Sequence, residues 1–311
     1  MLNFVYSGHQ SFALRISWLP KAVAAIENQI DPFGNPREGM KHLGLGKNMV
    51  EALEFWVKAT GVAQKTKAQW TLSDFASKVL SRQEGLDPFL ENQQTLWLLH
   101  WFLCSGWDDG ETTIRPYAWH FLTNVFPDDE MVATEVVDHF AGAVSTQPKS
   151  LSTVTLRQHF DVFIRTYVAG ESDASKGTPE DTLDSPLATL NLIKRYGEKK
   201  LPNGKRETIF RIDCGPKPSF STGAFRFCLQ SWWSRSHPNE KQLTLRDISF
   251  SEDSPGRVFR LPETDIYSRL VALTQSYPHE WRLVESQNQR GIERLEETNA
   301  DLLLKSIYER K

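Results

Sequence analysis

The sequence predicts a mainly α-helical protein with small β-hairpins, an α+β fold of two winged-helix-like domains and a helical C-terminal region. Apolar residues recur at helical spacing in most segments of the 311 residues. Two of these helical segments are followed by polar stretches typical of a β-hairpin. A break around Pro148 divides the chain, so we expect one domain over residues 1–148 and a second over residues 149–311.

The composition is that of a soluble globular protein, with 40% hydrophobic and 24% charged residues. No basic segment precedes an apolar run at the start, which argues against a secretory signal. The longest apolar stretch, residues 96–104, is far shorter than the ~20 residues that span a bilayer. Cys104, Cys214 and Cys228 form no CxxC pair. We therefore expect a cytoplasmic protein with reduced thiols and no membrane contact.

The net charge of −3 argues neither for nor against nucleic acid, but its distribution is informative. Residues 194–217 hold eight basic and three acidic side chains. Local charge makes a phosphate-binding surface, so this segment is the first candidate for DNA contact.

Residues 4–15 are expected to form an extended or looped lead-in to a helix over residues 18–26. His9 follows a Ser-Gly turn and could be a functional loop histidine, or it could satisfy nearby backbone groups. Arg15 could hold a phosphate or form a buried ion pair.

Residues 43–62 are expected to organise the N-terminal domain. A glycine turn enters a helix that Gly61 ends, with one apolar stripe made by Met49, Val50, Leu53, Trp56 and Val57. With a preceding helix at residues 20–28 or 37–42, this resembles a helix-turn-helix; the alternative is an ordinary core helix. A phosphate loop is excluded, because Lys41 and Asn48 stand where it needs glycine and serine or threonine.

A β-hairpin over residues 62–72 would complete a winged helix over residues 38–82. Its tip carries Lys65 and Lys67, which could touch the DNA backbone or remain solvated. Glu51 and Glu54 on the exposed helix face would repel phosphate, which leaves Lys47 and Asn48 as the contacts in this helix.

Asp87 and Glu91 are expected at the start of the next helix, where a capping acid followed by proline favours helix entry. Residues 96–103 are apolar around nearly the whole circumference and predict a central buried helix.

A helix over residues 155–167 carries Arg157, Asp161 and Arg165 at four-residue spacing. These side chains could pair along one face, or could hold a phosphate or a metal-bound phosphate. A loop over residues 170–182 and a short helix over residues 184–192 follow.

Asn203-Gly204 predicts the turn of a second hairpin, with arms at residues 192–196 and 208–213. Four basic residues near this turn are the strongest DNA-contact candidates, unless the loop is merely solvated: Lys199, Lys200, Lys205 and Arg206.

The last third is predicted to be helical over residues 223–233, 263–273 and 293–308. Residues 254–261 are expected to form a turn into a short extended segment. There Arg257 and Arg260 lie close enough in sequence to share a phosphate.

Four segments stand in the order found in a known family. They are residues 7–19, 43–50, 87–101 and 254–261, which include Ser7-Gly8-His9-Gln10, Leu43-Gly44-Leu45-Gly46, Asp87-Pro88-Phe89-Leu90 and Ser254-Pro255-Gly256-Arg257. Over nearly its whole length the chain resembles the uncharacterised-domain family encoded beside phosphoadenosine-phosphosulfate-reductase-like proteins in bacterial DNA phosphorothioation clusters.

This resemblance implies a DNA-acting component of a sulfur-modification and phage-defence system. One family member is proposed to nick DNA with a metal, which implies magnesium or manganese as the cofactor here. The implied partners are DNA, a cysteine desulfurase, an ATPase and an ATP-pyrophosphatase-like sulfurtransferase. The family pattern has Glu-Thr-Phe-Pro after its first histidine, whereas this chain has Gln10-Ser11-Phe12-Ala13, so no carboxylate follows His9.

Two main hypotheses follow. Metal-dependent nicking needs converging carboxylates, and the candidates come from separate segments: His9, Asp87, Glu91 and Asp161. The alternative is a non-catalytic winged-helix subunit that presents DNA to the sulfur-transfer enzymes. A protein-binding adaptor is a third hypothesis, which fits the acidic first half. The predicted DNA contacts are Arg15, Lys47, Asn48, Lys65, Lys67, Lys199, Lys200, Lys205, Arg206 and Arg257.

Overall fold

Helices make up most of the chain in the computed structural model, which describes residues 4–67, 69–106, 114–144, 151–169, 185–286 and 289–308. The α-helices are α1 (Trp18–Glu27), α2 (Pro36–Leu43), α3 (Lys47–Ala59), α4 (Gln93–Ser105), α5 (Tyr117–His120), α6 (Ala133–Val144), α7 (Thr153–Tyr167), α8 (Thr222–Ser236), α9 (Leu245–Phe250), α10 (Pro255–Val258), α11 (Glu263–Ser276) and α12 (Ala300–Tyr308). Shorter helical turns are η1 (Ala76–Leu80), η2 (Phe121–Val125) and η3 (Pro186–Leu190).

The strands form small sheets. They are β1 (Phe4–Val5) with β4 (Arg115–Pro116), β2 (Ala63–Thr66) with β3 (Gln69–Leu72), β5 (Glu130–Val132) with β7 (Arg206–Ile212) and β6 (Ile193–Lys200), and β8 (Gln242–Thr244) with β10 (Arg290–Arg294) and β9 (Trp281–Glu285). The predicted mainly helical fold with small β-hairpins is confirmed. The two winged-helix-like domains remain a prediction.

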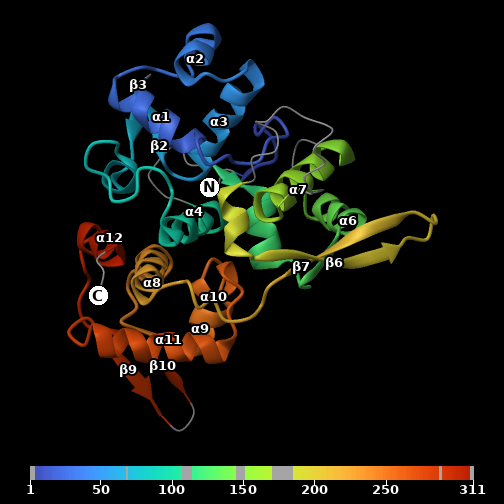
Figure 1. Cartoon of the computed structure of the whole chain (residues 1–311). Coiled ribbons are helices and arrows are strands. Elements are labelled where there is room, and N and C mark those ends of the chain that lie inside the picture. The colour runs from blue at the N-terminus through green and yellow to red at the C-terminus, as the bar shows by residue number, and fades with distance from the viewer. Residues whose placement is uncertain are drawn as a thin grey trace.

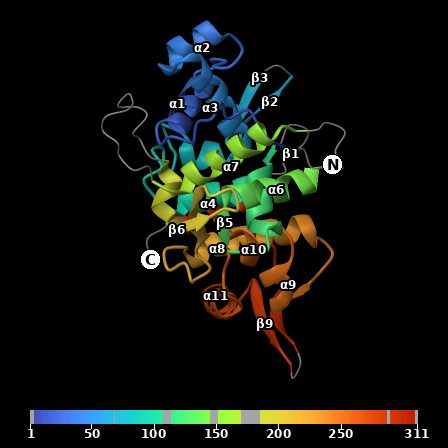
Figure 2. The ribbon, with the colours of Figure 1, turned by 90° about the vertical axis from the view of Figure 1, so that its right-hand side faces the viewer.

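The elements lie in three tiers that follow chain order (Figures 1 and 2). The first holds α1–α3 and β2–β3, the second α4–α7 and the β5–β7–β6 sheet, and the third α8–α12 and the β8–β10–β9 sheet. Among the described residues, no helix is both long and apolar enough to cross a bilayer.

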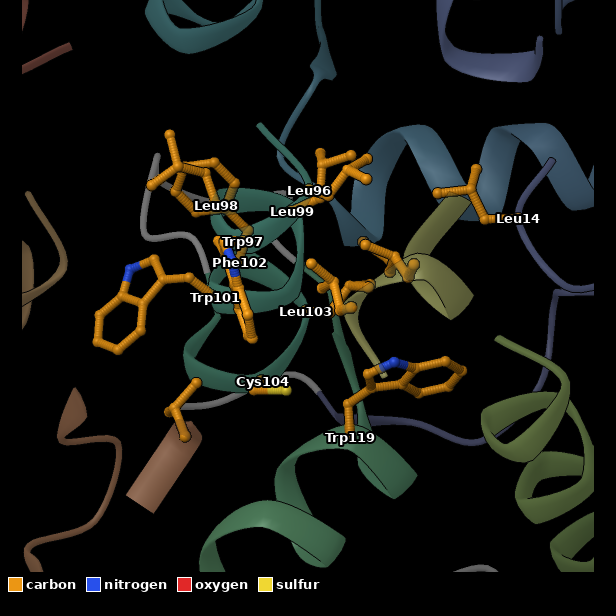
Figure 3. Close-up of a cluster of buried hydrophobic side chains, with 14 of the residues drawn as sticks. Leu14, Leu96, Trp97, Leu98, Leu99, Trp101, Phe102, Leu103, Cys104 and Trp119 are labelled. Atoms are coloured by element: carbon orange, nitrogen blue, oxygen red, sulfur yellow. The ribbon is translucent and has the colours of Figure 1, made fainter. Parts of the chain in front are cut away.

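Helix α4 lies at the centre, as its sequence predicts. Every residue from Thr95 to Ser105 is buried, because α4 contacts α5, α8 and η3 on different sides. Figure 3 shows its large side chains pointing in several directions into the core, with Trp119 of α5 beside them. This helix joins the second tier to the third.

Helix α3 packs against α1, α2 and β2 in the first tier. Val50, Leu53, Trp56 and Val57 are buried on one face, and Gly61 follows the helix in the left-handed conformation at φ +63°. Hairpin β2–β3 follows in the predicted place.

The second tier contains a hairpin longer than expected. Strands β6 and β7 pair from Ile193 opposite Ile212 to Lys200 opposite Arg206, and the hairpin extends away from the body of the molecule (Figure 1). Strand β5 precedes the predicted domain boundary and pairs with β7, which follows it. The boundary near Pro148 falls outside the described residues, as does the predicted loop over residues 170–182.

Two predictions for the third tier are wrong. Residues 254–261 begin with helix α10 instead of an extended segment, because the Ser254 hydroxyl accepts the Arg257 N–H and Pro255 stands in the first turn. The last helix starts only at Ala300. Glu293 and Arg294 belong to β10, which pairs with β8 and β9 and buries Ile292.

Candidate nucleic-acid interface

Helix α7 and the β6–β7 hairpin border an open cavity of about 560 Å³. Its lining carries five basic side chains and two acidic ones. The charged lining residues are Arg157, Asp161, Arg165, Arg195, Lys205, Arg206 and Glu207. Of the predicted site residues, the structure brings together Asp161, Lys205 and Arg206 here.

The sequence of α7 explains how its charged side chains face the cavity. The Ser152 hydroxyl accepts the Thr155 N–H and starts the helix, and its apolar stripe packs inward. Phe160 contacts Phe210 of β7, with ring centroids 6.5 Å apart. The stripe Arg157-Asp161-Arg165 is thereby directed along the cavity wall.

Arg157 holds both acids of the wall. Its Nε lies 3.0 Å from Asp161 Oδ1, and one of its terminal nitrogens lies 3.2 Å from Glu207 Oε1. Arg165 instead donates from Nε to the main-chain oxygen of Asp161, at 3.2 Å. The predicted ladder of three paired charges is therefore one ion pair and one backbone contact.

The electrostatics of the wall favour an anion. Burial would raise the pKa of Glu207, but hydrogen bonds from Thr134 and Arg157 lower it overall. Burial lowers the pKa of Arg157, but Asp161 and Glu207 raise it overall. Arg165 differs: burial lowers its pKa and Asp161 offsets this only in part, so its charge is incompletely compensated.

The hairpin turn has the predicted chemistry. Gly204 has φ +81°, and Asn203 Oδ1 accepts the Lys205 N–H at 3.0 Å. This places Lys205 and Arg206 on the cavity, where Arg206 also lies 3.2 Å from Glu198 across the hairpin.

A histidine pair lies on the buried side of α7. His9 Nε2 is 3.1 Å from Nδ1 of His159, and both rings are buried and stacked. Burial first, and then the charge of Arg165, lowers the pKa of His9 to about 4. At neutral pH His9 is therefore a buried, uncharged ring, and it does not line the cavity.

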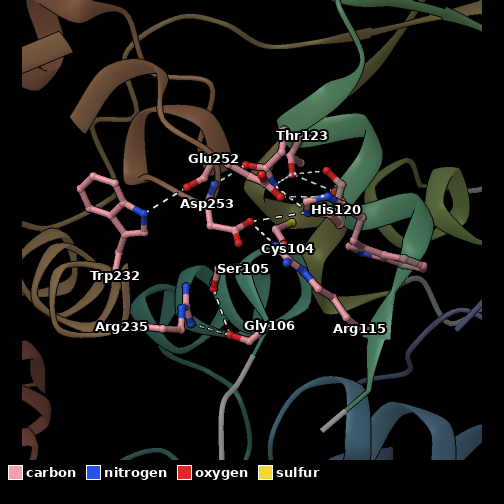
Figure 4. Close-up of polar contacts among 12 residues, drawn as sticks. Cys104, Ser105, Gly106, Arg115, His120, Thr123, Trp232, Arg235, Glu252 and Asp253 are labelled. Carbon is pink, nitrogen blue, oxygen red and sulfur yellow. Dashed lines mark hydrogen bonds and ion pairs between the residues drawn. The ribbon is translucent and has the colours of Figure 1, made fainter. Parts of the chain in front are cut away.

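A second cluster, at the contact of α5 with the loop before α10, offers metal-ligand atoms. His120, Glu252 and Asp253 each present one such atom, all within 4.8 Å of one another. Figure 4 shows these side chains meeting beside Cys104 and Arg115. Arg115 forms an ion pair with Asp253 and donates to the main-chain oxygen of Cys104 at 2.9 Å.

The donor set fits a divalent cation. Two carboxylates and an imidazole suit manganese better than magnesium, which prefers an all-oxygen shell. Asp253 would have to share its oxygens between the ion and Arg115. None of these residues lines the α7–hairpin cavity.

A family model described as a protein of unknown function, DUF4007, matches residues 6–308. The chain belongs to the DUF4007 family. No curated protein matches it.

Two crystal structures of SspB share the DUF4007 chain's fold, one described as magnesium ion-bound. Their TM-scores are 0.82 and 0.81, and each is 24% identical, over 98% of this chain and 89% of the other. At this identity the likeness shows the fold alone.

The predicted catalytic residues Asp87 and Glu91 of the DUF4007 chain differ in their surroundings. Asp87 does not cap a helix, since α4 begins only at Gln93 with Asn92 as its cap. The Asp87 carboxylate instead accepts the N–H groups of Glu91 and Asn92 and the hydroxyl of Thr95, at 2.6–3.0 Å. The Glu91 side chain is exposed.

The basic residues predicted for the first tier are dispersed. Arg15 is buried over the rings of Phe12 and Trp18. The side chains of Lys47 and exposed Asn48 lie at the start of α3, with the Lys47 ammonium 3.9 Å from Glu51. The remaining ones are Lys65, which lies 3.3 Å from Asp31, and exposed Lys67.

Two more of the predicted DNA contacts lie on the hairpin: Lys199 forms an ion pair with Glu135, and Lys200 is exposed near the hairpin end. In the third tier, Arg257 donates to the Phe250 main-chain oxygen at 3.1 Å. Sequence reasoning missed Arg195 and Glu207 in the cavity. It also missed the His120 cluster, for which the adjacent acids Glu252 and Asp253, just before a family motif, were the available signal.

Proposed function

We propose that this DUF4007 protein is a DNA-binding component of a bacterial DNA phosphorothioation system, and that backbone phosphates enter the α7–hairpin cavity. The observation that carries this proposal is the excess of basic side chains lining the cavity. Neutralising phosphates dominates the affinity of proteins for DNA, so such a cavity is suited to the backbone.

The arrangement of charges supports the proposal. Arg157 engages both acids of the wall, Asp161 and Glu207, and Asp161 compensates the buried charge of Arg165 only in part. A phosphate beside Arg165 would compensate a charge that burial now disfavours. The protruding hairpin gives the cavity one β-sheet wall that duplex or single-stranded DNA could follow.

The biological context is supported by four sequence segments and by the fold. The segments beginning at Ser7, Leu43, Asp87 and Ser254 resemble the family encoded in phosphorothioation clusters. SspB, whose fold this chain shares, is similar over nearly its whole length. In this role the protein would present DNA to a cysteine desulfurase, an ATPase and an ATP-pyrophosphatase-like sulfurtransferase.

Charge reversal tests the proposal. Lys205→Glu with Arg206→Glu should weaken binding of a fluorescent DNA duplex, measured by anisotropy, and lower the slope of log affinity against log salt by about 2. Lys241→Glu with Arg246→Glu, at two exposed residues of the third tier, is the matched control and should change neither quantity by as much. Equal behaviour of the two variants would remove the hairpin from the interface.

Metal-dependent nicking of DNA is the second candidate function, and the His120-Glu252-Asp253 cluster favours it. A bound cation would supply Lewis-acid stabilisation of phosphate and a more acidic water. The three side chains would hold the ion, and the ion pair of Arg115 with Asp253 would orient that carboxylate. The separation of this cluster from the cavity lining makes binding the better supported function.

A further inference from the structure

Tyr196 is an exposed aromatic ring on the basic hairpin. The Tyr196 side chain is 57% exposed. It lies on β6, which is an edge strand in the β5–β7–β6 order. The pairing register shifts between Arg195 and Gly197, so Tyr196 is the extra residue of a β-bulge. Bulges redirect side chains, and here the redirected side chain is an exposed ring.

One face of the ring is held in place. The guanidinium carbon of Arg211 lies 3.3 Å from the ring centroid, and Arg211 is itself fixed by an ion pair with Glu130. A cation on one face orients the ring and leaves its remaining surface to solvent. Tyr196 is thus a supported, outward-facing aromatic platform.

The platform is adjacent to the phosphate-binding wall. Arg195, the residue before Tyr196, lines the cavity, and Lys194 pairs across the sheet with Arg211. Proteins that bind single strands combine such basic grooves with aromatic rings on which bases stack. Bases in an intact duplex are stacked on one another, so only an unpaired base can lie on Tyr196 while its phosphates contact the cavity.

We propose that Tyr196 is a base-stacking platform that gives the hairpin a preference for unpaired DNA, such as a gap or a melted segment, over intact duplex. This inference rests on the proposed DNA-binding function and names the form of DNA that the site takes. The bound DNA strand crosses the free edge of β6, with its phosphates on the cavity side and one base against the ring of Tyr196.

The test compares a fluorescent single strand of about twenty nucleotides, longer than the ~4–16 nucleotides that single-strand sites commonly cover, with its duplex at one salt concentration. Tyr196→Ala should weaken single-strand binding about 5- to 10-fold and change duplex binding less than about 2-fold, because stacking on an aromatic side chain contributes this much per base. Tyr196→Phe keeps the ring and should bind like the unaltered protein.

A second measurement needs no substitution. Photo-crosslinking the unaltered protein to a single strand that contains 5-iodouracil should join the base to Tyr196, identified by mass spectrometry. A crosslink elsewhere, or equal loss of single-strand and duplex binding in Tyr196→Ala, overturns the inference while leaving the DNA-binding function intact. No binding of either DNA by the unaltered protein overturns both.

Discussion

His9 Nε2 lies 3.1 Å from Nδ1 of His159 in the interior behind α7. The Ala118 N–H donates to Nε2 of His159 at 3.0 Å, so the proton of a neutral His159 ring is on Nδ1 and points at His9. The Ser11 N–H approaches His9 Nδ1 at 3.2 Å. A neutral His9 ring offers one acceptor nitrogen, so Ser11 and His159 compete for it, and a protonated ring offers none.

Acid should therefore destabilise the fold. The pKa of His9 is about 4 in the folded state, because of burial and then Arg165, against about 6.5 when unfolded. Below pH 6.5 the unfolded chain binds a proton that the folded chain does not, so stability falls with pH down to about 4. His9 alone accounts for about 2 kcal/mol between pH 7 and pH 5. Burial also lowers the pKa of His159 and of His100, so both act in the same direction.

Urea unfolding at pH 7 and pH 5 measures this loss. His9→Gln should flatten the pH dependence, whereas His139→Gln, at an exposed histidine of α6, should leave it as it is. Identical free energies of unfolding at the two pH values would show that the pair is not buried and neutral.

Much of the fold follows from local sequence. The helical spacing that predicts residues 155–167 also predicts which side chains of α7 share its charged face. The Asn203-Gly204 turn and the surrounding charge predict the basic hairpin. These elements could be predicted because their periodicity and turn chemistry act over a few residues.

The features that could not be predicted from the sequence depend on contacts between distant segments of the chain. Arg157 and Glu207 are 50 residues apart and meet only because α7 packs on β7. His120 and Glu252 meet because α10 packs against η2. In Glu293 and Arg294, strand pairing overrides a helix-favouring composition. No local pattern encodes such convergence.

Arg165→Met should change both the DNA affinity of the protein and the pKa of His9. Methionine fills similar space without charge, so the variant should bind DNA about 10-fold more weakly if Arg165 makes a desolvated contact with phosphate. The pKa of His9 should rise above about 4, because the positive charge that lowers it is gone, yet stay below its usual value because burial is the larger cause.

Anisotropy measures the DNA affinity, and imidazole NMR signals measure the titration of His9. Arg37→Met, which removes a charge from exposed α2, is the control for both. Weaker DNA binding with an unmoved His9 titration would place Arg165 farther from His9 than the structure has it.

Asp87→Ala should destabilise the protein by about 2–4 kcal/mol, because three donors would lose one buried acceptor. The donors are the N–H groups of Glu91 and Asn92 and the hydroxyl of Thr95. Glu91→Gln should be nearly neutral, since that side chain is exposed. Thermal unfolding followed by circular dichroism tests both, and a neutral Asp87→Ala would reopen a functional role for this carboxylate.

The His120-Glu252-Asp253 cluster should bind Mn²⁺ more tightly than Mg²⁺, because imidazole is a poor ligand for the smaller, harder ion. Loss of the free-Mn²⁺ electron paramagnetic resonance signal measures binding directly. Glu252→Gln and His120→Asn should each weaken it about 10-fold or more, because a carboxylate or an imidazole is replaced by a neutral amide, which is a weaker ligand. Asp138→Asn, at an exposed acid of α6 outside the cluster, is the control.

The same variants separate nicking from binding. If the cluster serves cleavage, the unaltered protein with Mn²⁺ converts supercoiled plasmid to open circle, a chelator stops it, and Glu252→Gln is inactive although it still binds DNA. Asp161→Asn then tests the cavity, because a catalytic carboxylate there would be needed as well. Intact plasmid under every metal, alongside unchanged DNA affinity, would leave the protein as a binding subunit. Nicking that survives Glu252→Gln but not Asp161→Asn would move the cleavage centre to the α7–hairpin cavity, where we propose that the phosphates bind.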